Sequence, residues 1–489
     1  MAQADRYPAQ GGLDPQDWDA FRARAHDMLD AALEQMKSAE QGAVWTPLPE
    51  ETKETYRTPL PREGKGGVAV ADQLAQLLPY GVGNTHPRFF GWVHGSGTPG
   101  NLMADIAAAA LNANLGGRDH GAMYVEKQVL DWVRELFDFP EDSSGLVVSG
   151  TSVATVIALK TARDRALGWA SRKEGVDGAR LVGYTSEQTH SCVARAFDIL
   201  GLGSDALRKI PTDADFRIDL EALTHAIDAD RAAGYHPFAV IGTAGAVNVG
   251  SIDDLSAVAD IAAKENLWMH VDGAFGALGV LSETVRPMLK GLERADSLAF
   301  DFHKWMHVNY DAGCVLIRSE EEHRKTFSER PEYLKAASRG LAAGNPWPVE
   351  YGPELSRGFR ALKVWTQIAE HGTDRIGAMV ERNCGQAVLL GKLVDAADDL
   401  ELMAPVALNI CCFRVLRAGL DDTALDALNE EIVIRLQEDG IAAPSTTKIH
   451  GRVAIRVNIT NHRTQDEDME ILLSAIERIV PDCSQEAAE

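Results

Sequence analysis

The stretch Leu298-Ala-Phe-Asp-Phe-His-Lys-Trp-Met-His307 decides how the rest of this chain is interpreted. An apolar run typical of a buried strand ends at Phe300, and Lys304 follows directly, between bulky aromatic residues. A partly desolvated amine is nucleophilic toward an aldehyde, so Lys304 is a candidate Schiff-base former. The alternative is a solvated lysine in a turn between a strand and a loop.

A second apolar strand, upstream of the first, ends in an acid. The stretch Trp268-Met-His-Val-Asp-Gly-Ala-Phe-Gly276 carries Asp272, which stands 32 residues before Lys304. On its own, an acid after a strand is often only a helix cap. Strand, acid, small residues, second strand and lysine together form the layout expected when a pyridine-type cofactor lies across strand ends and the acid pairs with its ring nitrogen.

At these residues the chain resembles the group II amino-acid decarboxylases, which use pyridoxal 5'-phosphate (PLP), and among them the aromatic-L-amino-acid decarboxylases. The resemblance runs from about His86 to the C-terminal region. It implies the aspartate-aminotransferase-like α/β fold of PLP enzymes, fold type I, with a mainly parallel seven-stranded sheet in a large domain and a small C-terminal α+β domain. The expected domains are an N-terminal helical and extended segment that packs on a partner subunit (1–85), the PLP-binding domain (86–371) and the small domain (372–489).

Length and charge set limits on the function. A chain of 489 residues exceeds what one hydrophobic core usually supports. Its net charge of -24 argues against a nucleic-acid or anionic-membrane partner, because both need basic patches. Six scattered cysteines indicate neither a disulfide framework nor a metal site. With no membrane-length apolar tract and no apolar leader, the protein is expected to be soluble and cytoplasmic.

The pattern along the chain places these motifs. Strands alternate with helices through the middle of the sequence, which favours a mainly parallel sheet with its site at the carboxyl ends of the strands. Residues 14–36 have the apolar spacing of an amphipathic helix. Residues 46–65 are interpreted as an extended linker and residues 320–352 as a mobile loop.

A candidate phosphate site lies in Gly145-Leu-Val-Val-Ser-Gly-Thr-Ser-Val-Ala-Thr155, where a strand turns into a helix. Backbone N–H groups at the helix start and the hydroxyls of Thr151 and Ser152 suit a phosphate, although Ser and Thr cap most helices. The turn resembles the family's Ser-Gly-Gly-Ser-Glu-Ala-Asn phosphate cup. Asp301 occupies a position where family members often carry Asn near the phosphate, and an acid there should repel the phosphate unless it points away.

The resemblance adds further cofactor contacts. Gln188-Thr-His-Ser191 resembles the family's Gln-x-His-Ser-Ser motif and implies that the His190 ring stacks on the pyridine. The alternative for His190 is a residue that only begins a helix. Ala274 leaves room on the other face of the ring, Thr243 lies at the polar end of a strand, and His303 precedes the lysine; all three are expected to contact the cofactor.

The substrate is less clearly indicated. His86-Pro-Arg-Phe-Phe-Gly-Trp-Val-His-Gly-Ser-Gly-Thr-Pro99 concentrates aromatic residues in a loop, which favours a pocket lining. The resemblance puts Trp92 and Val93 near the substrate side chain. The segment Asn112-Ala-Asn-Leu-Gly-Gly-Arg-Asp-His120 departs from the family pattern, and its Arg118 and His120 are candidate contacts for a polar or acidic substrate.

The resemblance implies roles for the remaining residues. Lys304 holds PLP until the substrate amine displaces it, and Asp272 keeps the pyridine nitrogen protonated. Arg357, at the start of a long helix, is a candidate for orienting the site. Tyr333, in Pro331-Glu-Tyr-Leu-Lys335, resembles the proton-donating tyrosine of the family's Pro-x-Tyr-Leu-Lys, where aldehyde-forming relatives typically carry phenylalanine. The site is expected between the two subunits of a homodimer.

The resulting hypothesis is PLP-dependent decarboxylation of an L-amino acid, preferably aromatic, to the amine and carbon dioxide. Three alternatives stay open at this point. The substrate is a polar or acidic amino acid, the reaction is oxidative deamination to an aldehyde or transamination on the same scaffold, or the protein is an inactive PLP-binding homologue.

Overall fold

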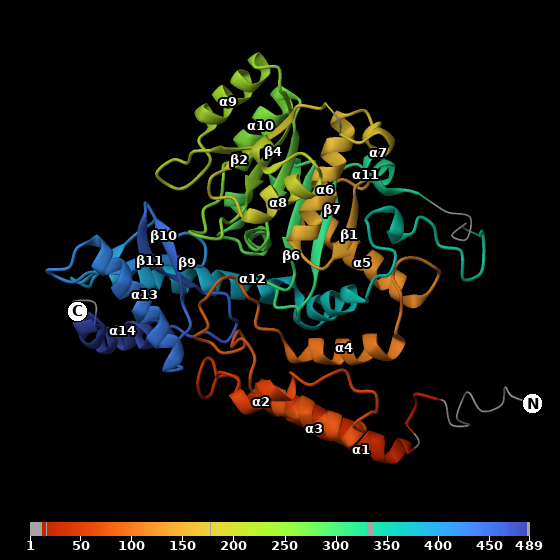
Figure 1. The fold of residues 1–489 in the computed structure, drawn as a ribbon. Helices are drawn as coiled ribbons and strands as arrows, with labels where there is room; N and C mark the ends of the chain where they lie inside the picture. The colour runs from red at the N-terminus through yellow and green to blue at the C-terminus, as the bar shows by residue number, and fades with distance from the viewer. Residues whose placement is uncertain (1–11, 16, 177, 330–336, 487–489) are drawn as a thin grey trace, which may run out of the picture.

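The computed structural model describes residues 12–15, 17–176, 178–329 and 337–486, and the chain forms three parts (Figure 1). A large α/β part contains the middle of the sequence, and a smaller part contains the C-terminal region. The N-terminal helices form a third block at the edge of the molecule.

The large part is built on one sheet. Within the described residues its seven strands are β1 Ser144–Val148, β2 Leu181–Ser186, β3 Leu207–Ile210, β4 His236–Thr243, β5 Trp268–Asp272, β6 Ser297–Asp301 and β7 Gly313–Ile317. Their order is β1-β7-β6-β5-β4-β2-β3, with β7 antiparallel to both neighbours and all other pairs parallel. The predicted mainly parallel seven-stranded sheet is therefore confirmed.

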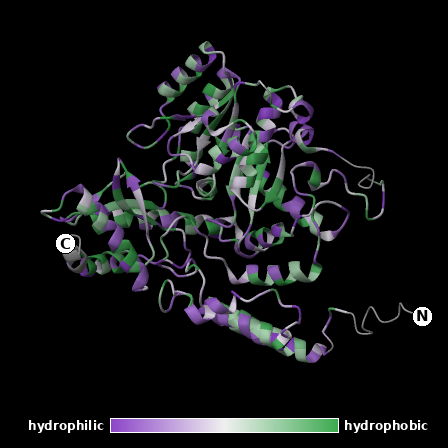
Figure 2. Ribbon diagram, in the orientation of Figure 1, coloured by the Kyte–Doolittle hydropathy of each residue, from purple (hydrophilic) through white to green (hydrophobic). Residues whose placement is uncertain are grey.

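Helices cover both faces of this sheet because its central strands are apolar on both sides. Every residue of β5, β6 and β7 is buried. Neighbouring residues of a strand point to opposite faces, so Phe300 packs in the core with α5, α9 and α10, whereas Ala299 packs with α6 and α8. Figure 2 shows hydrophobic residues concentrated along these strands. The helices are α5 Gly121–Leu136, α6 Thr151–Ala166, α7 Ser171–Glu174, α8 Ser191–Ile199, α9 Leu220–Ala232 and α10 Leu255–Glu265.

The strand register gathers the polar strand ends at one edge. Thr243 of β4 lies opposite Asp272 of β5, and Asp272 lies opposite Ala299 of β6. Gly313 of β7 lies between Asp301 of β6 and the last residue of β1, Val148. Because β1 and β6 both run antiparallel to β7, they end at the same edge, and α6 begins there as well.

The smaller part is an antiparallel α+β unit joined to the large part by one long helix. In the described region its sheet has the order β10-β11-β9-β8, with β8 Leu400–Leu402, β9 Ile410–Val415, β10 Ser445–Ile449 and β11 Arg452–Asn458. Helices α13 Asp422–Glu438 and α14 Glu467–Glu486 pack on it. Helix α12 Arg360–Asp395 is bent at Gly372 (φ 69°, ψ 158°); Val364 lies in the core of the large part and Leu390 in that of the small part.

The N-terminal block contains α1 Trp18–Lys37, α2 Glu50–Thr55 and α3 Gly67–Leu77, and α4 Pro99–Leu111 follows it. The predicted helix over 14–36 is confirmed as α1, which Asp17 caps by accepting hydrogen bonds from Asp19 N and Ala20 N. The predicted extended linker over 46–65 is wrong where α2 forms. In Figure 2, hydrophobic residues continue along α4 and the N-terminal helices, although these helices lie at the outside of the molecule.

The predicted mobile loop over 320–352 is wrong at its start, where α11 Glu320–Phe327 forms. Ser319 caps this helix, and acidic residues in the first turn and basic residues in the last turn suit the helix dipole. The high charge of this segment therefore belongs to a solvent-exposed helix and not to a loop.

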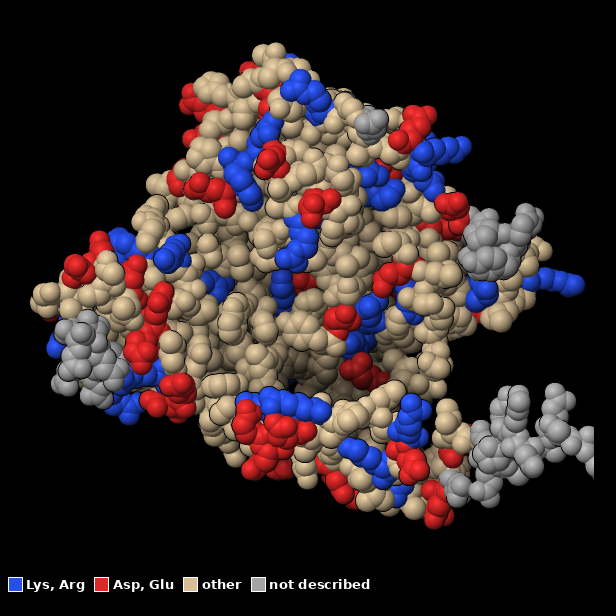
Figure 3. Space-filling model, viewed as in Figure 1, with Lys and Arg blue, Asp and Glu red and all other residues tan. Residues whose placement is uncertain are grey.

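Charges of both signs are interspersed on the surface (Figure 3). On the face shown in Figure 3, Lys and Arg side chains lie among Asp and Glu side chains, and a hollow opens above the N-terminal helices. Among the described helices, none combines the length and apolar character needed to cross a bilayer.

Candidate active site

A cavity of about 340 Å³ lies at the edge of the sheet where β1, β5 and β6 end. It brings together six of the residues predicted from the sequence, which come from four separate segments of the chain. Its lining is Ser149, Gly150, Thr151, Ser152, Val153, His190, Cys192, Ala274, Asp301, His303 and Lys304.

Lys304 follows β6 in a tightly held turn. The neighbouring Trp305 is fully buried, and its ring N–H donates to Asn383 Oδ1 at 3.1 Å. A Cβ added at Gly95 would meet the carbonyl oxygens of His303 and Lys304 at 2.2 and 2.4 Å, so only glycine allows this loop to lie against the turn. The Lys304 side chain is 22% exposed, and its Nζ lies 2.9 Å from Asp301 Oδ2. The turn therefore aims the amine into the cavity.

Asp272 ends β5 and is a buried acid with few partners. Its Oδ1 accepts a hydrogen bond from Ala274 N at 3.2 Å, and Cys192 Sγ lies 3.9 Å from its Oδ2. Burial raises the pKa of this carboxyl, while Lys304 and His190 act in the opposite direction. Within the described residues Asp272 has no ion pair, and a protonated ring nitrogen brought to it would supply a positive partner.

His190 caps α8 and borders the same cavity as Ala274. Its Nδ1 accepts a hydrogen bond from Cys192 N at 3.2 Å, which fixes the ring orientation. Burial lowers the pKa of His190 and favours the neutral ring. The cavity lining thus contains a neutral planar ring and a small residue, the two residue types expected to lie against a flat ligand.

The predicted phosphate turn opens into the cavity at the first residue of α6. Thr151 Oγ1 is buried, and within the described residues it has no hydrogen-bond partner. A buried hydroxyl without a partner is costly, and an anion at this helix start would satisfy it. The Thr151 N–H is already occupied, because it donates to Asp301 Oδ1 at 2.6 Å. The acid at position 301 therefore does not point away from the turn.

Two further predicted contacts lie close to this group. His303 borders the cavity, with its Nδ1 2.9 Å from Ala312 O, and burial lowers its pKa. Thr243 is buried beside Asp272, and its Oγ1 lies 3.3 Å from Thr189 Oγ1. Neither Thr243 nor Asp272 is among the residues that line the cavity; Asp272 lies just behind it, next to the lining residues Cys192 and Ala274.

An aromatic series leads from the surface toward the lysine. Ring centroids are 6.0 Å apart for Trp92 and His94, 5.9 Å for His94 and Tyr310, and 4.4 Å for Tyr310 and His303. The aromatic loop 86–99 signalled the first two rings, whereas Tyr310 was missed because its contact with this loop spans more than 200 residues. Val93 is buried in the core, next to Trp92.

Arg118 and His120 do not reach this cavity within one chain. The Arg118 guanidinium lies 4.7 Å from the Trp347 ring centroid, and His120 Nε2 lies 3.3 Å from Asn114 O. Both residues line a separate pocket of about 630 Å³. Tyr333 lies outside the described residues.

Arg357 is held inside the large part rather than in the cavity. It pairs with Glu126, and it donates to the carbonyls of Leu115 and Val147 at 2.8 and 2.6 Å. Val147 belongs to β1, which leads into the phosphate turn. Arg357 therefore holds the strand that leads into the phosphate turn, and it does not line the Lys304 cavity.

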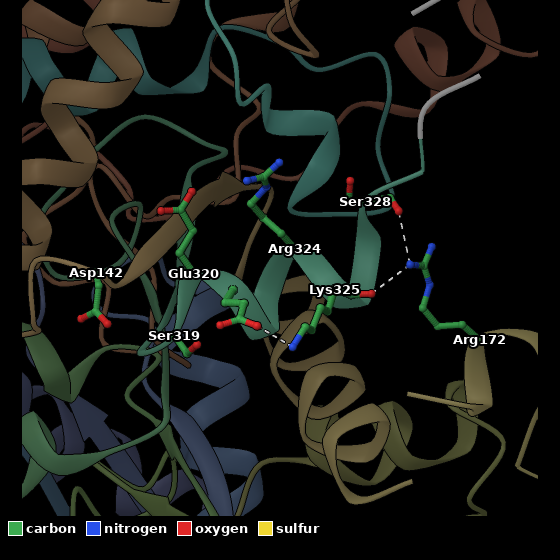
Figure 4. Close-up of a pocket in the computed structure, with 8 residues that line it drawn as sticks. Asp142, Arg172, Ser319, Glu320, Arg324, Lys325 and Ser328 are labelled. Carbon is green, nitrogen blue, oxygen red and sulfur yellow. Dashed lines mark hydrogen bonds and ion pairs between the residues drawn. The ribbon is translucent and has the colours of Figure 1, made fainter. Parts of the chain in front are cut away.

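A larger pocket, of about 660 Å³, lies beside α11, away from these residues (Figure 4). Arg172 donates there to the carbonyls of Lys325 and Ser328, and the Lys325 side chain pairs with Glu321. Its cations are thus already bonded, Arg324 to Glu350 beyond the pocket lining, so we place the chemistry at Lys304.

Comparisons with known proteins identify the family of this chain. The pyridoxal-dependent decarboxylase conserved domain matches residues 49–416. The chain is 36% identical to an aromatic-L-amino-acid decarboxylase of Bacillus atrophaeus, over 82% of each protein, and 31% identical to an L-2,4-diaminobutyrate decarboxylase of Rhizobium meliloti, over 86% of this chain and 83% of that protein. The crystal structure of Oryza sativa TDC with PLP and tryptamine has a TM-score of 0.87 at 26% identity and covers 96% of this chain and 99% of its own.

The fold and the cavity define a fold type I PLP enzyme. The chain belongs to the pyridoxal-dependent decarboxylase family: its cofactor is PLP, and it is a carboxy-lyase that acts on an amino acid. The residues present fit this cofactor: the amine of Lys304, the buried acid Asp272 and the Thr151 hydroxyl, which has no partner within the described residues, would meet its aldehyde, ring nitrogen and phosphate. The resemblance found in the sequence is confirmed.

Replacing Asp272 with asparagine tests the assigned ring-nitrogen partner. We expect Asp272→Asn to keep the bound-cofactor absorbance and to lower kcat about 10²- to 10³-fold, because a neutral amide does not hold a positive charge on the ring nitrogen. The readouts are carbon dioxide release and the visible spectrum. Asp468→Asn, which changes a buried acid of the small part that accepts a hydrogen bond from Gln465 N, is the matched control. Parent-level turnover by Asp272→Asn would contradict the assignment.

Proposed function

We propose that this enzyme converts an aromatic L-amino acid to the corresponding amine and carbon dioxide. The observation that carries the proposal is the aromatic series that reaches His303, the residue before Lys304. Trp92 and Tyr310 are 54% and 49% exposed, so both present ring faces to a ligand. Aromatic pairs contribute about 0.5–1.5 kcal/mol beyond area burial, which favours an aromatic substrate side chain here.

In this proposal six residues in and beside the cavity have defined tasks. Lys304 carries PLP, Asp272 holds a proton on the ring nitrogen, and Thr151 and Ser152 bind the phosphate. His190 and Ala274 keep the ring flat between them. When bound, PLP supplies a conjugated ring that accepts the electron pair left behind by carbon dioxide. The buried strand ends exclude water, which strengthens each of these electrostatic contacts.

The names of relatives support an aromatic substrate without deciding it. The Bacillus atrophaeus relative is named for aromatic L-amino acids, and the Oryza sativa structure contains tryptamine. The Rhizobium meliloti relative is named for 2,4-diaminobutyrate, a polar substrate. The aromatic series favours the first group.

We also propose a homodimer whose active sites lie between subunits. The helices α1, α3 and α4 expose apolar side chains that soluble proteins usually cover. Arg118 and His120 line a pocket on their own subunit without reaching its Lys304 cavity, and a dimer gives them a place at the partner's cavity. The exposed apolar residues are Trp18, Phe21, Leu33, Val68, Val70, Leu74, Leu77, Met103, Ile106 and Leu111.

A cytoplasmic location completes the proposal. Five cysteines in the described residues are free, and Cys411 and Cys412, neighbours in β9, lie in different cores on opposite faces of its sheet. Burial raises the pKa of Cys384 and Cys412 to about 12, which keeps them as thiols. Such cysteines are typical of a reducing compartment.

Carbon dioxide release from each common L-amino acid and from L-dopa tests the substrate class. We expect the highest kcat/KM for tryptophan, tyrosine, phenylalanine or dopa, and we expect Trp92→Ala to lower that value about tenfold through lost ring contact. Trp169→Ala is the matched control outside the aromatic series. A clear preference for glutamate, aspartate or 2,4-diaminobutyrate would refute the aromatic assignment.

Replacing Tyr333 separates decarboxylation from aldehyde formation. A phenol beside the substrate carbon returns a proton after carbon dioxide leaves, so we expect Tyr333→Phe to slow amine formation and to divert flux, with oxygen, to aldehyde, ammonia and peroxide. Cofactor absorbance should not change. Tyr310→Phe, which keeps its ring, is the control. If Tyr333→Phe makes amine at the parent rate without aldehyde, another group donates the proton.

Subunit complementation tests the shared site. Each active site takes Lys304 from one subunit and His120 from the other, so Lys304→Ala and His120→Ala each disable every site of their own homodimers. When equal amounts of the two variants are mixed at random, half of the dimers contain both kinds of subunit. Each of these has one intact site and one doubly altered site. We expect remixing to restore about a quarter of the parent activity. Asp272→Asn, on the same side of the site as Lys304, replaces His120→Ala in the control, and remixing should then restore no activity. Activity that stays at the level of the separate variants, or a monomer by light scattering, would contradict the proposal.

A further inference from the structure

The carboxylate of Asp301 stands where two essential groups of the cavity meet. Its Oδ1 accepts a hydrogen bond from the Thr151 backbone N–H at 2.6 Å, and its Oδ2 lies 2.9 Å from Lys304 Nζ. The side chain is only 4% exposed. One acid thus bridges the N-terminus of α6 and the reactive amine.

The chain leaves space for this arrangement. A Cβ added at Gly313 would lie 2.6 Å from Asp301 Oδ1, and one added at Gly150 would lie 3.4 Å from the same atom. Gly313 lies between Val148 and Asp301 in the sheet. Two glycines on neighbouring segments therefore make room for the carboxylate at the start of the helix.

Both groups bound by Asp301 are ones that PLP requires. A phosphate at the start of α6 needs the Thr151 N–H together with the unpartnered Thr151 hydroxyl. An aldehyde needs the Lys304 nitrogen. A helix N-terminus favours one anion, and a second anion at the same donors is repelled. The carboxylate and the cofactor phosphate therefore compete for one position.

We propose that Asp301 is a built-in competitor for the cofactor: it holds α6 and Lys304 together in the cofactor-free protein and weakens the binding of PLP through its phosphate. Asp301 acts on the site by positioning Thr151 and Lys304. The inference rests on the proposed phosphate position at Thr151 and is independent of which amino acid is decarboxylated. It gives the enzyme a stable cofactor-free form and makes its activity responsive to the concentration of PLP.

The test compares full-length, cofactor-free parent with Asp301→Asn, whose amide oxygen still accepts a hydrogen bond from Thr151 N without a negative charge. Dissociation constants are measured by fluorescence titration with PLP and with pyridoxal, which lacks the phosphate. We expect the Kd for PLP to fall about tenfold or more, and the Kd for pyridoxal to fall less. Asp254→Asn, which removes the same charge from the N-cap of α10 outside the cavity, should change neither value.

Thermal unfolding supplies a second readout. Without ligand, Asp301→Asn is expected to unfold at a lower temperature than the parent, because a charged cap and an ion pair are lost. Inorganic phosphate should raise the unfolding temperature of the variant more than that of the parent. If Asp301→Asn does not fold, Asp301→Ser provides the same comparison with a smaller side chain.

An unchanged or higher Kd for PLP in the folded variant would overturn the proposal, since Asp301 would then be neutral or helpful to the cofactor. An equal gain for PLP and pyridoxal would also overturn it, because the competition would not involve the phosphate. These measurements use no amino-acid substrate. A wrong substrate class would therefore leave them unaffected and would appear only in the carbon dioxide assays.

Discussion

The register between β5 and β6 is the constraint on which the site depends. It sets Asp272 opposite Ala299, so the acid stands beside the strand that leads to Lys304. Because β1 and β6 flank β7, the phosphate turn begins at the same edge. A shift of one residue would turn every side chain of a strand to the other face and separate the acid from the amine. Burial of these strands on both faces makes such a shift costly.

Two acids, Asp272 and Asp301, differ in their bonding partners and together define the electrostatics around the cavity. Asp272 is fully buried with one backbone hydrogen bond, and burial raises its pKa, so it favours the arrival of a positive charge. Asp301 already has a cation and a backbone donor. Burial lowers the pKa of His190 and His303, which favours their neutral rings. The cavity is therefore prepared for a ligand that is positive at one end and negative at the other.

The sequence predicted the sheet and most of the cavity because Asp272, Lys304 and the phosphate turn each stand at a strand end, and the carboxyl ends of parallel strands share an edge. It could not predict the direction of Asp301, which depends on the space left by Gly313 across the sheet. Tyr310 joined the aromatic series through a contact with the distant loop 86–99. Helix α11 was missed because a strongly charged segment without an apolar stripe has the composition of a loop.

Borohydride reduction of the enzyme loaded with PLP, followed by digestion and mass spectrometry, tests most directly whether Lys304 is the cofactor-bearing residue. Reduction fixes the cofactor to the nitrogen that binds it. One phosphopyridoxyl group per chain, on the peptide that contains Lys304, is the predicted result. A label on another lysine, such as Lys209, or a chain without a label would contradict the assignment of the active site.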